Sequence, residues 1–413
     1  MTVPRTGSKR LLRDLNQSIL FNLIAEEQAI SRTRLAEKSG LPAATVTRII
    51  REFISAGLVI EVKIEASSGG RRPVLLSINP AAGYTVGVKL RENGMTMTIC
   101  DLRGSIIRDC EQTFPGGTSP QQIIERISMT MKQLVRKAGL SLRQILGLGV
   151  GLGGLIDSEH GICRYSPLLG WHNVELAPAL QFRLHVPVCL DNDVNTLAIG
   201  ERLFGQGRGT QNFLLITIGR GIGMGIIIDG KIYRGEYGGA GEFGHMTIDL
   251  SPDAPRCICG KRGCLDAVAS YYGILQAATH RDPGYRVREE ITTLIEQARA
   301  GDTALQAIFH RAGEALGIAI ANVITLFDPE RIVISGEGIL AGDVLLKPLQ
   351  EAIPPHIFGP PRERALIFTP IKETDWARGA ACLILQRVFQ PPIYEDDEYI
   401  HPFDSLLTQR TSR

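Results

Sequence analysis

The sequence predicts an α/β protein that carries a winged helix-turn-helix head at its N-terminus. Residues 1–80 show helical periodicity, followed by a short strand, a Gly-Gly loop and a second strand. From about residue 82 to 390, β-rich apolar runs alternate with amphipathic helices, a pattern typical of α/β architecture. Residues 391–413 open with two prolines and continue through Glu395-Asp396-Asp397-Glu398, and we expect them to form an acidic tail.

Composition limits the class of protein before any motif is considered. The chain has 413 residues, of which 44% are hydrophobic and 21% charged, so it can bury two or three cores and is not wholly disordered. No apolar run reaches the roughly 18 residues that a membrane helix needs. The apolar stretch Ile19-Leu20-Phe21 is too short for the core of a signal peptide. We therefore expect a cytoplasmic protein without a membrane span.

The first two predicted helices follow from apolar spacing and capping residues. One apolar face of the first helix is marked by Leu15, Ile19, Leu20, Leu23 and Ile24. Ser31 is a suitable N-cap for a short second helix that runs through Ser39. Gly40 then permits the tight turn that a helix-turn-helix requires.

The third helix carries the residues that we expect to meet DNA. Pro42 is placed at its first position, where a missing N–H group costs nothing, and Gly57 ends it. The spacing i, i+3, i+4, i+7 assigns its buried face to Val46, Ile49, Ile50 and Phe53. The opposite face consists of Ala44, Thr45, Thr47, Arg48 and Arg51. Small and hydroxyl side chains at the start of such a helix can approach base edges and phosphates in a major groove.

Two predicted strands after the third helix complete a winged helix. Leu58-Val59-Ile60 and residues 74–78 flank the loop Gly69-Gly70-Arg71-Arg72-Pro73. Glycines let the backbone approach DNA, and Arg71 and Arg72 offer phosphate or minor-groove contacts. Residues 1–80 hold 12 Lys and Arg against 7 Asp and Glu, a net charge of +5 that suits a polyanion. The alternative is a three-helix interaction module with a solvated basic loop.

Three of the eight cysteines lie within eight residues and predict a metal site. Cys257, Cys259 and Cys264 occupy a glycine-punctuated loop, and His245 precedes the first of them by twelve residues. Three thiolates and one imidazole complete a tetrahedral Zn²⁺ shell with no position left for water, so the zinc would be structural. The alternative is three unrelated reduced cysteines and a loop histidine.

A glycine-rich stretch and an acidic stretch give weaker signals. Residues 214–218 read as a buried strand that enters Gly219-Arg220-Gly221-Ile222-Gly223, and this pattern fits either a tight hairpin or a phosphate-binding loop. Asn192 and Asp193 follow another apolar strand, and Glu242 precedes His245 by three residues. Asn and Asp at a strand end can bind sugar hydroxyls, although Asp193 could instead be a helix N-cap.

Taken together, these motifs resemble the ROK family of repressors and sugar kinases, in particular its xylose- and N-acetylglucosamine-type repressors. The most specific parts are the Gly-Gly-Arg-Arg-Pro loop, Asn192-Asp193, and residues 238–266, and the match runs from about residue 12 to 390. The resemblance implies a winged helix (1–80) joined to a two-lobed, actin- and hexokinase-like ligand domain, usually dimeric or tetrameric. The lobes would be 82–190, completed by a helix at about 375–390, and 191–374.

Residue by residue, the resemblance places a sugar or sugar phosphate at Asn192, Asp193, Glu242, His245 and Asp266. It places zinc on His245, Cys257, Cys259 and Cys264. Because the two ring nitrogens of a histidine are distinct, His245 can serve both ligands.

The chain departs from the family's kinases where ATP would bind. The Asp-x-Gly-Gly-Thr phosphate loop of the kinases corresponds here to positions that include Lys89, Arg91, Glu92 and Asn93. Arg220 stands where kinases usually carry Thr. The acid, both glycines and the hydroxyl of the first loop are gone, so we expect no enzymatic activity.

Two further departures concern the sugar. The family usually has Leu-Glu after the last cysteine, but Asp266 is one methylene shorter, and Leu168 replaces a frequent Asn. We expect these changes to alter sugar specificity. The resulting prediction is a sugar-responsive DNA-binding repressor that binds operator DNA as a homodimer or homotetramer. Two rival hypotheses are a sugar kinase with an added DNA-binding head and a regulator controlled by a partner protein.

Overall fold

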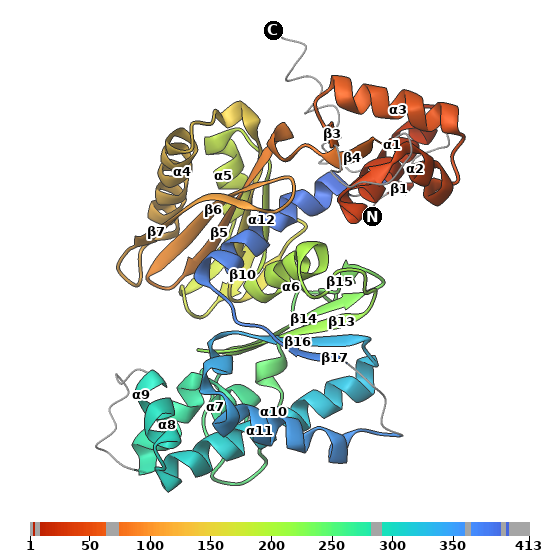
Figure 1. Cartoon of the computed structure of the whole chain (residues 1–413). Helices are drawn as coiled ribbons and strands as arrows, with labels where there is room; N and C mark the ends of the chain where they lie inside the picture. The colour runs from red at the N-terminus through yellow and green to blue at the C-terminus, as the bar shows by residue number, and fades with distance from the viewer. Residues whose placement is uncertain are drawn as a thin grey trace. The chain divides into compact units, whose positions relative to one another are not determined.

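The computed structural model describes residues 3–4, 9–62, 74–281, 291–359, 365–389 and 394–395. The chain divides into two compact units, each with its own five-stranded sheet (Figure 1). The first unit comprises Met1–Val150, Glu175–Leu190 and Ala380–Arg413. The second unit comprises Gly151–Val174 and Asp191–Gly379. Helices and strands alternate through both units, so the predicted α/β class is confirmed.

The head, residues 9–62 and 74–80 of the first unit, is a winged helix-turn-helix. Its helices are α1 (Lys9–Glu27), α2 (Arg32–Ser39) and α3 (Ala43–Ser55). A small sheet has the order β2 (Ile30–Ser31), β4 (Leu75–Ile78), β3 (Val59–Val62). As predicted, Ser31 caps α2 by accepting a hydrogen bond from the Arg34 N–H, and Gly40 makes the turn with φ of 67°. Val46, Ile49, Ile50 and Phe53 form the buried face of α3, also as predicted.

Two predicted details of the head are wrong. In the predicted apolar face of α1, Leu20 and Ile24 are buried as expected, but Ile19 is 41% exposed and Phe21, which was not predicted, is buried. The Phe21 ring stacks on Phe389 of the C-terminal helix at 5.8 Å between centroids, and this long-range contact sets the buried face. Pro42 is the residue before α3 and not its first helical residue, so the helix begins one position later than expected.

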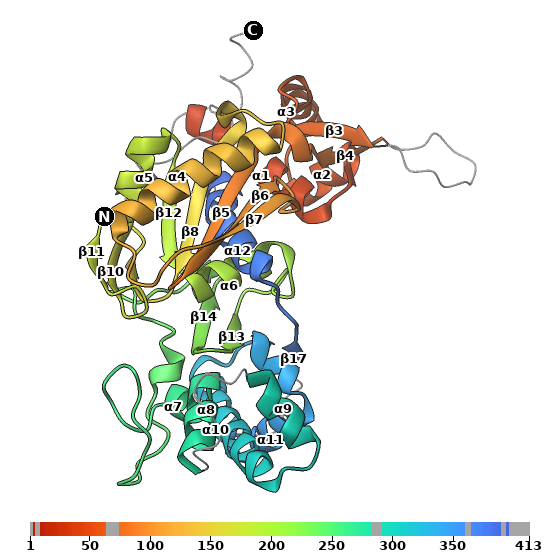
Figure 2. The same ribbon diagram turned by 90° about the vertical axis from the view of Figure 1, so that its left-hand side faces the viewer.

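The body of the first unit is a five-stranded sheet with helices on both faces. The strand order is β12 (Val188–Asn192), β8 (Ile145–Leu152), β5 (Tyr84–Arg91), β6 (Gly94–Asp101), β7 (Ile106–Thr113). One face is covered by α4 (Pro120–Lys137) and α5 (Leu176–Leu184), and the C-terminal part of α12 (Glu373–Phe389) lies on the other (Figure 2). A Cβ atom on Gly149 would lie 1.8 Å from the Ala380 carbonyl oxygen, so only glycine lets α12 approach β8 this closely. The short strands β1 (Val3–Pro4) and β18 (Tyr394–Glu395) pair antiparallel.

The second unit contains the sheet β15 (Lys231–Ile232), β14 (Ile222–Ile228), β13 (Phe213–Ile218), β16 (Arg331–Ser335), β17 (Ala365–Phe368). On one face lies α6 (Asp193–Phe204), and a larger helical layer covers the other (Figure 1). That layer consists of α7 (Leu265–Ala269), α8 (Tyr271–Arg281), α9 (Ile291–Arg299), α10 (Thr303–Phe327) and α11 (Asp343–Ala352). A three-stranded sheet of β9 (Leu155–Asp157), β10 (Ile162–Ser166) and β11 (Trp171–Val174) completes the unit.

The glycine-rich stretch forms a hairpin. β13 and β14 pair antiparallel from Phe213↔Ile227 to Ile218↔Ile222, and the Gly219 N–H donates to the Gly221 carbonyl across the turn. A Cβ on Gly223 or Gly225 would lie 2.7 Å or 2.5 Å from side-chain carbons of α6. These two glycines therefore serve close packing of a helix on the sheet, the first of the two readings of this stretch.

One helix bears on the expectation of a protein without a membrane span. By length and composition α10 is apolar enough to do so, although 56% of its most apolar window is buried inside the protein. Leu316, Ile320 and Val323 of α10 are at most 1% exposed and belong to the apolar core of the second unit. The packing therefore identifies α10 as a core helix, whose apolar length is explained by burial.

Candidate functional site

The predicted DNA-reading face of α3 is available on the head. Ala44, Arg48 and Arg51 are exposed, and Thr45 and Thr47 are half-buried. No side chain caps the start of α3, because Pro42 occupies the N-cap position and offers no acceptor. Uncapped N–H groups at a helix start, next to the small side chains of Ala43 and Ala44, are a ready site for a phosphate oxygen.

The two arginines of this face differ in their surroundings. The Arg48 guanidinium donates to Glu52 at 2.8 Å, and the same carboxylate also accepts from Arg13 and Gln17 at 3.1 Å. The Arg51 side chain makes no hydrogen bond or ion pair with another described residue. Glu52 is a residue that sequence reasoning missed, although its i+4 spacing from Arg48 is the usual signal of a helical ion pair.

The wing can be followed only at its base. β3 and β4 pair in the register Val59↔Ile78 to Val62↔Leu75, which places the two ends of the connecting loop side by side. Arg71 and Arg72, both predicted to contact DNA, lie outside the described residues.

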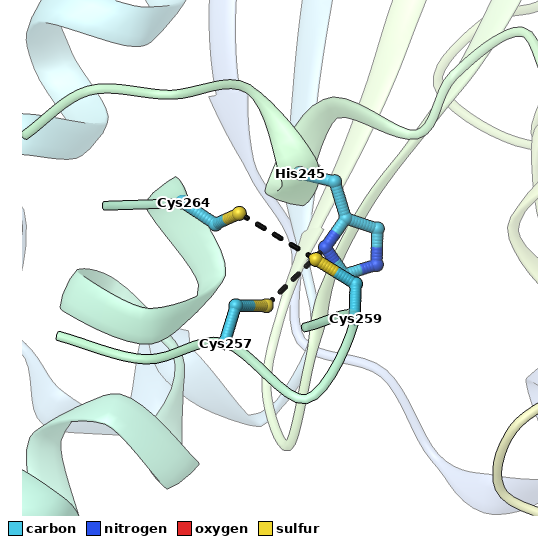
Figure 3. A group of neighbouring side chains, drawn as sticks. All are labelled: His245, Cys257, Cys259 and Cys264. Carbon is cyan, nitrogen blue, oxygen red and sulfur yellow. Dashed lines mark hydrogen bonds between the residues drawn. The ribbon is translucent and has the colours of Figure 1, made fainter. Parts of the chain in front are cut away.

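The four predicted metal ligands converge in the second unit. Their ligand atoms all lie within 4.8 Å of one another (Figure 3). The Cys259 and Cys264 sulfurs are 3.7 Å apart, and the Cys257 sulfur is 3.5 Å from the His245 Nδ1. A tetrahedral zinc with Zn–S of about 2.3 Å and Zn–N of about 2.05 Å has S···S edges of about 3.8 Å and S···N edges of about 3.6 Å. The donor set and its spacing therefore fit a zinc ion.

Local backbone geometry explains why the loop can gather three sulfurs. The Cys257 N–H donates to the Lys261 carbonyl, which closes a turn, and Arg256 and Arg262 pair as an antiparallel bridge. Gly263 has φ of 71°, and a Cβ there would lie 1.9 Å from the Asp249 carbonyl oxygen. Burial raises the pKa of the Cys257 thiol to about 12, and a bound cation would reverse that effect by stabilising the thiolate.

The strand-to-helix junction after β12 carries the predicted sugar residues Asn192 and Asp193. Asn192 is the N-cap of α6, because its Oδ1 accepts from the N–H groups of Val194 and Asn195, while its Nδ2 donates to the Gly154 carbonyl at 3.2 Å. Asp193 is the first helical residue, so the alternative in which Asp193 itself is the N-cap is wrong.

The remaining predicted sugar residues, Glu242, His245 and Asp266, gather near Asp193. The His245 Nε2 lies 3.7 Å from a Glu242 oxygen, so the imidazole directs one nitrogen to the thiols and the other to this carboxylate. Burial raises the pKa of Glu242, His245 opposes that rise, and the negative charges of Asp193 and Asp266 add to it. The structure therefore brings the predicted acids together in the second unit, with His245 shared between them and the thiols.

Asp266 has a different role from the other acids. Its side chain is 5% exposed, and its Oδ1 accepts from the Ile222 N–H at 2.9 Å, which ties α7 to the β13–β14 turn. Burial raises the pKa of Asp266, and the hydrogen bond from Ile222 lowers it. Leu168, the replacement noted in the sequence, is 47% exposed and lies near Asp193, since a Cβ on Gly153 would be 3.8 Å from both side chains.

Sequence reasoning missed the ion pair that supports this site. Asp191 is 1% exposed and accepts two contacts from the Arg234 guanidinium, at 2.8 Å from Nε and 2.6 Å from Nη2. It also accepts from the Asn195 side chain and the Asn192 N–H. Both guanidinium nitrogens contact the same oxygen, Asp191 Oδ2, and because Arg234 begins the loop that leads to Glu242, this charge-assisted pair holds the two halves of the site together. Only the apolar strand before Asp191 hinted at its burial.

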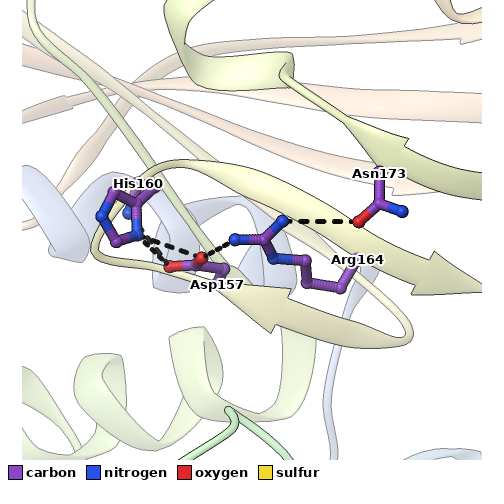
Figure 4. Close-up of polar contacts among 4 residues, drawn as sticks. All are labelled: Asp157, His160, Arg164 and Asn173. Carbon is purple, nitrogen blue, oxygen red and sulfur yellow. Dashed lines mark hydrogen bonds and ion pairs between the residues drawn. The ribbon is translucent and has the colours of Figure 1, made fainter.

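Polar contacts also stabilise the three-stranded sheet of β9, β10 and β11, in which Leu168 lies in the loop between β10 and β11. The Asp157 carboxylate accepts from Arg164 at 2.6 Å and contacts the His160 Nδ1 at 3.0 Å, and Arg164 reaches Asn173 on the next strand (Figure 4). Burial opposes the charged form of Asp157, but the hydrogen bonds from His160 and Arg164 outweigh it and lower the pKa of this carboxyl.

At the positions of the expected kinase phosphate loop, the first unit has a tight charged hairpin. Arg91 pairs with Gly94, so β5 and β6 are joined by the two residues Glu92 and Asn93 alone. The Arg91 guanidinium is bound to Glu111 at 2.7 Å. Arg220 is exposed at the second expected phosphate loop, in the turn between β13 and β14. Neither turn offers the run of free glycine N–H groups that cradles a triphosphate.

Two family profiles match the chain, the ROK family over residues 85–387 and a winged helix-turn-helix DNA-binding family over residues 12–60. A protein named xylose repressor from Caldicellulosiruptor bescii is 32% identical over 357 residues, which cover 84% of this chain and 89% of that relative. The Escherichia coli K12 protein named DNA-binding transcriptional dual regulator NagC is 33% identical over 354 residues, covering 84% and 86%.

Solved structures agree with these relatives. A ROK family transcriptional regulator, described as a homologue of the E. coli MLC protein, has a TM-score of 0.78 and 29% identity, and the match covers 96% of this chain and 98% of that one. A ROK family glucokinase from Streptomyces griseus, in complex with glucose and AMPPNP, has a TM-score of 0.63 and 26% identity over 74% of this chain and all of that one. The similarity to the regulator thus extends over the head, and the similarity to the kinase covers a smaller part of the chain.

Proposed function

This chain belongs to the ROK family, and from that premise we propose that it is a cytoplasmic, sugar-responsive repressor of genes for carbohydrate uptake or breakdown. The observation that carries the proposal is the combination of an exposed α3 face in a winged helix-turn-helix with a cluster of acids and a histidine in a ROK fold. Full-length similarity to proteins named as repressors supports it.

The head would bind operator DNA through α3. Ala44, Thr45 and Thr47 are small enough to let the helix start approach a major groove, and Arg48 and Arg51 would contact base edges or phosphates. Arg71 and Arg72 of the wing would add backbone or minor-groove contacts. We propose that two heads of a homodimer or homotetramer read two half-sites, because a single head of this size contacts only one.

A monosaccharide or sugar phosphate would bind at Asn192, Asp193, Glu242 and His245. The carboxylate oxygens of half-buried Asp193 and of exposed Glu242 can accept hydrogen bonds from neighbouring hydroxyls, and the His245 Nε2 lies 3.7 Å from a Glu242 oxygen. The Asn192 side chain caps α6, so most of its hydrogen-bonding capacity is already used. The Asp266 carboxylate already accepts a hydrogen bond from the β13–β14 turn. These two residues would therefore orient the site, with fewer direct contacts to the sugar.

A structural zinc on His245, Cys257, Cys259 and Cys264 would complete the site. The zinc would fix the plane of the imidazole and draw the thiols into one turn, so that His245 presents its other nitrogen to the sugar. The tetrahedral edge lengths between the ligand atoms support this assignment.

We propose a division of labour along the chain that follows the sequence prediction. Residues 1–80 bind DNA, residues 82–190 with the helix at about 375–390 form one lobe, and residues 191–374 form the lobe with the zinc loop. The acidic tail would be 391–413. Sugar binding would lower operator affinity, and a hundredfold release corresponds to about 2.7 kcal/mol of coupling between the two sites.

The experiment that tests the function combines DNA binding with a sugar panel. Fluorescence anisotropy of DNA from the regions next to the chain's own gene measures operator affinity, with xylose, N-acetylglucosamine and N-acetylglucosamine 6-phosphate as ligands. One of them should weaken binding about a hundredfold in the wild type, and Asp193→Asn should abolish the response while DNA binding is retained. Sugar-dependent ADP formation in a coupled assay would instead identify a kinase. Tight DNA binding that no sugar changes would favour control by a partner protein.

A further inference from the structure

A large cavity lies in the second unit beside the metal cluster. It measures about 1100 Å³ and is bounded by the two limbs of the metal loop and by helices α7, α8 and α10. None of the five predicted sugar residues lines it. Its volume is slightly above the range of about 300–1,000 Å³ that is usual for ligand pockets, which are mostly apolar with a few placed polar groups.

The charged residues that line the cavity are mostly cationic. Arg256 and Arg262 come from the two limbs of the metal loop and Arg311 comes from α10, against the single acid Asp253. Three guanidinium groups around one opening favour a phosphate or carboxylate, because the planar guanidinium fork matches these anions in two parallel hydrogen bonds.

The hydrogen-bonding capacity of these arginines is only partly used. The Arg256 side chain has no hydrogen bond or ion pair with another described residue. The Arg262 Nη1 donates to the Ala254 carbonyl at 2.9 Å. The Arg311 Nη2 contacts Asp249 at 2.6 Å, and the Arg311 side chain remains 66% exposed. An anion in the cavity would therefore find donors that described parts of the chain do not satisfy.

Much of the remaining lining is apolar, and Ser251, Gln276 and Thr279 add uncharged polar groups. Ala267 and Val268 of α7, Ala277 of α8 and Ile308 of α10 contribute to the walls. An inorganic ion would leave these walls in contact with water, whereas an organic anion with an apolar body would bury them. The combination of cationic and apolar lining is the chemistry of an amphipathic small molecule.

We propose that this cavity binds a small organic anion that carries a phosphate or carboxylate group on an apolar body. Arg256 and Arg262 are directly paired in the antiparallel bridge of the metal loop, and both line the cavity, so both limbs of the loop contribute to one binding site. The anion would be a second ligand, at a site separate from the proposed sugar residues.

Calorimetry on the full-length, zinc-loaded protein tests the proposal with three probes. Phenyl phosphate and benzoate carry the two candidate anions on the same apolar ring, and benzyl alcohol is the neutral control. At least one anion should bind, and benzyl alcohol should bind at least about tenfold more weakly. The stronger of the two anions then identifies the preferred group. No binding of either anion, or equal binding of the alcohol, would overturn the proposal.

Variants assign the binding to the cavity. Arg256→Ala should weaken binding of the preferred anion at least about tenfold, and Arg143→Ala, which removes an exposed arginine of the first unit, should leave it unchanged. Ala277→Trp should block binding by filling the cavity, and zinc content measured on each variant shows whether the metal loop is intact. If Arg256→Ala loses zinc, the result for Ala277→Trp decides whether the anion binds in the cavity.

One further variant separates this site from the sugar site. Asp193→Asn should bind the anion as tightly as the wild type does, whatever the outcome of the sugar experiment. Loss of anion binding in that variant, or full binding in Ala277→Trp, would place the anion elsewhere and refute the assignment.

Discussion

Removing the guanidinium of Arg234 should destabilise the second unit more than any exposed ion pair can. Arg234→Ala leaves the Asp191 carboxylate, which is 1% exposed, without its charged partner. Removing one partner of a buried ion pair lowers the free energy of unfolding by about 3–5 kcal/mol. Because the Arg234 side chain is 31% exposed, we expect the lower end, a decrease of about 3 kcal/mol. Asp191→Asn should cost less, because an amide needs no counter-charge, and the double variant should cost less than the sum of the two.

The two tryptophans of the chain provide the assay. Trp171 and Trp376 are both buried and both belong to the second unit, so their fluorescence during urea unfolding follows that unit. With a denaturant slope of about 3 kcal/mol/M, a loss of about 3 kcal/mol lowers the urea midpoint by about 1 M. Lys347→Ala, which breaks an exposed i,i+4 pair with Glu351, is the control and should change the midpoint by less than about 0.2 M. An unchanged midpoint in Arg234→Ala would refute the reasoning.

Three further predictions concern the metal, the head and acid stability. Metal analysis should return about one zinc per chain, and Cys264→Ser should lose it and lower the melting temperature of the second unit; full zinc occupancy in that variant would contradict the assignment. Arg51→Ala should weaken DNA binding more than Arg48→Ala does, because Arg48 already shares Glu52, and Glu52→Gln should strengthen binding at low salt, as measured by anisotropy. The pKa of Asp157 is lower in the folded protein than the value of about 3.9 for an unfolded aspartate. The ionised carboxylate therefore stabilises the fold above about pH 3.9, and this stability is lost as the pH falls from there through the pKa of the folded state. Asp157→Asn should therefore flatten the fall in stability between about pH 5 and 3, and tryptophan-monitored urea midpoints that decline as steeply as in the wild type would exclude this role.

The parts of the fold that were predicted correctly depend on residues close together in the sequence. The buried face of α3 follows from spacing within one helix, and the metal cluster from three cysteines in eight residues with His245 nearby. The buried face of α1 was predicted only in part: Leu20 and Ile24 are buried, but Ile19 is exposed, and Phe21 was missed because it packs on Phe389, 368 residues further along the chain. No local pattern in α1 contains that information.

The same distinction explains the candidate site. Asn192 and Asp193 were found because a strand end is visible in the sequence, but the Asp191–Arg234 pair depends on a partner 43 residues away. Gly223 and Gly225 fitted two structures equally well, since a glycine that admits a phosphate and a glycine that admits a helix are identical in sequence. Only the position of α6 distinguishes these structures.

The metal loop and the sugar residues meet in one short helix, and this gives the zinc a role beyond stabilising the loop. Cys264 is the residue immediately before α7, and Asp266, two residues on, binds the Ile222 N–H at the β13–β14 turn. A helix of five residues cannot hold its place through its own hydrogen bonds, so α7 depends on what fixes its ends. If zinc fixes the first end, its loss displaces Asp266 and frees the imidazole of His245 at the same time. Zinc removal should then abolish sugar binding while the head still binds DNA, so that a zinc-free repressor would stay on its operator whether or not the sugar is present.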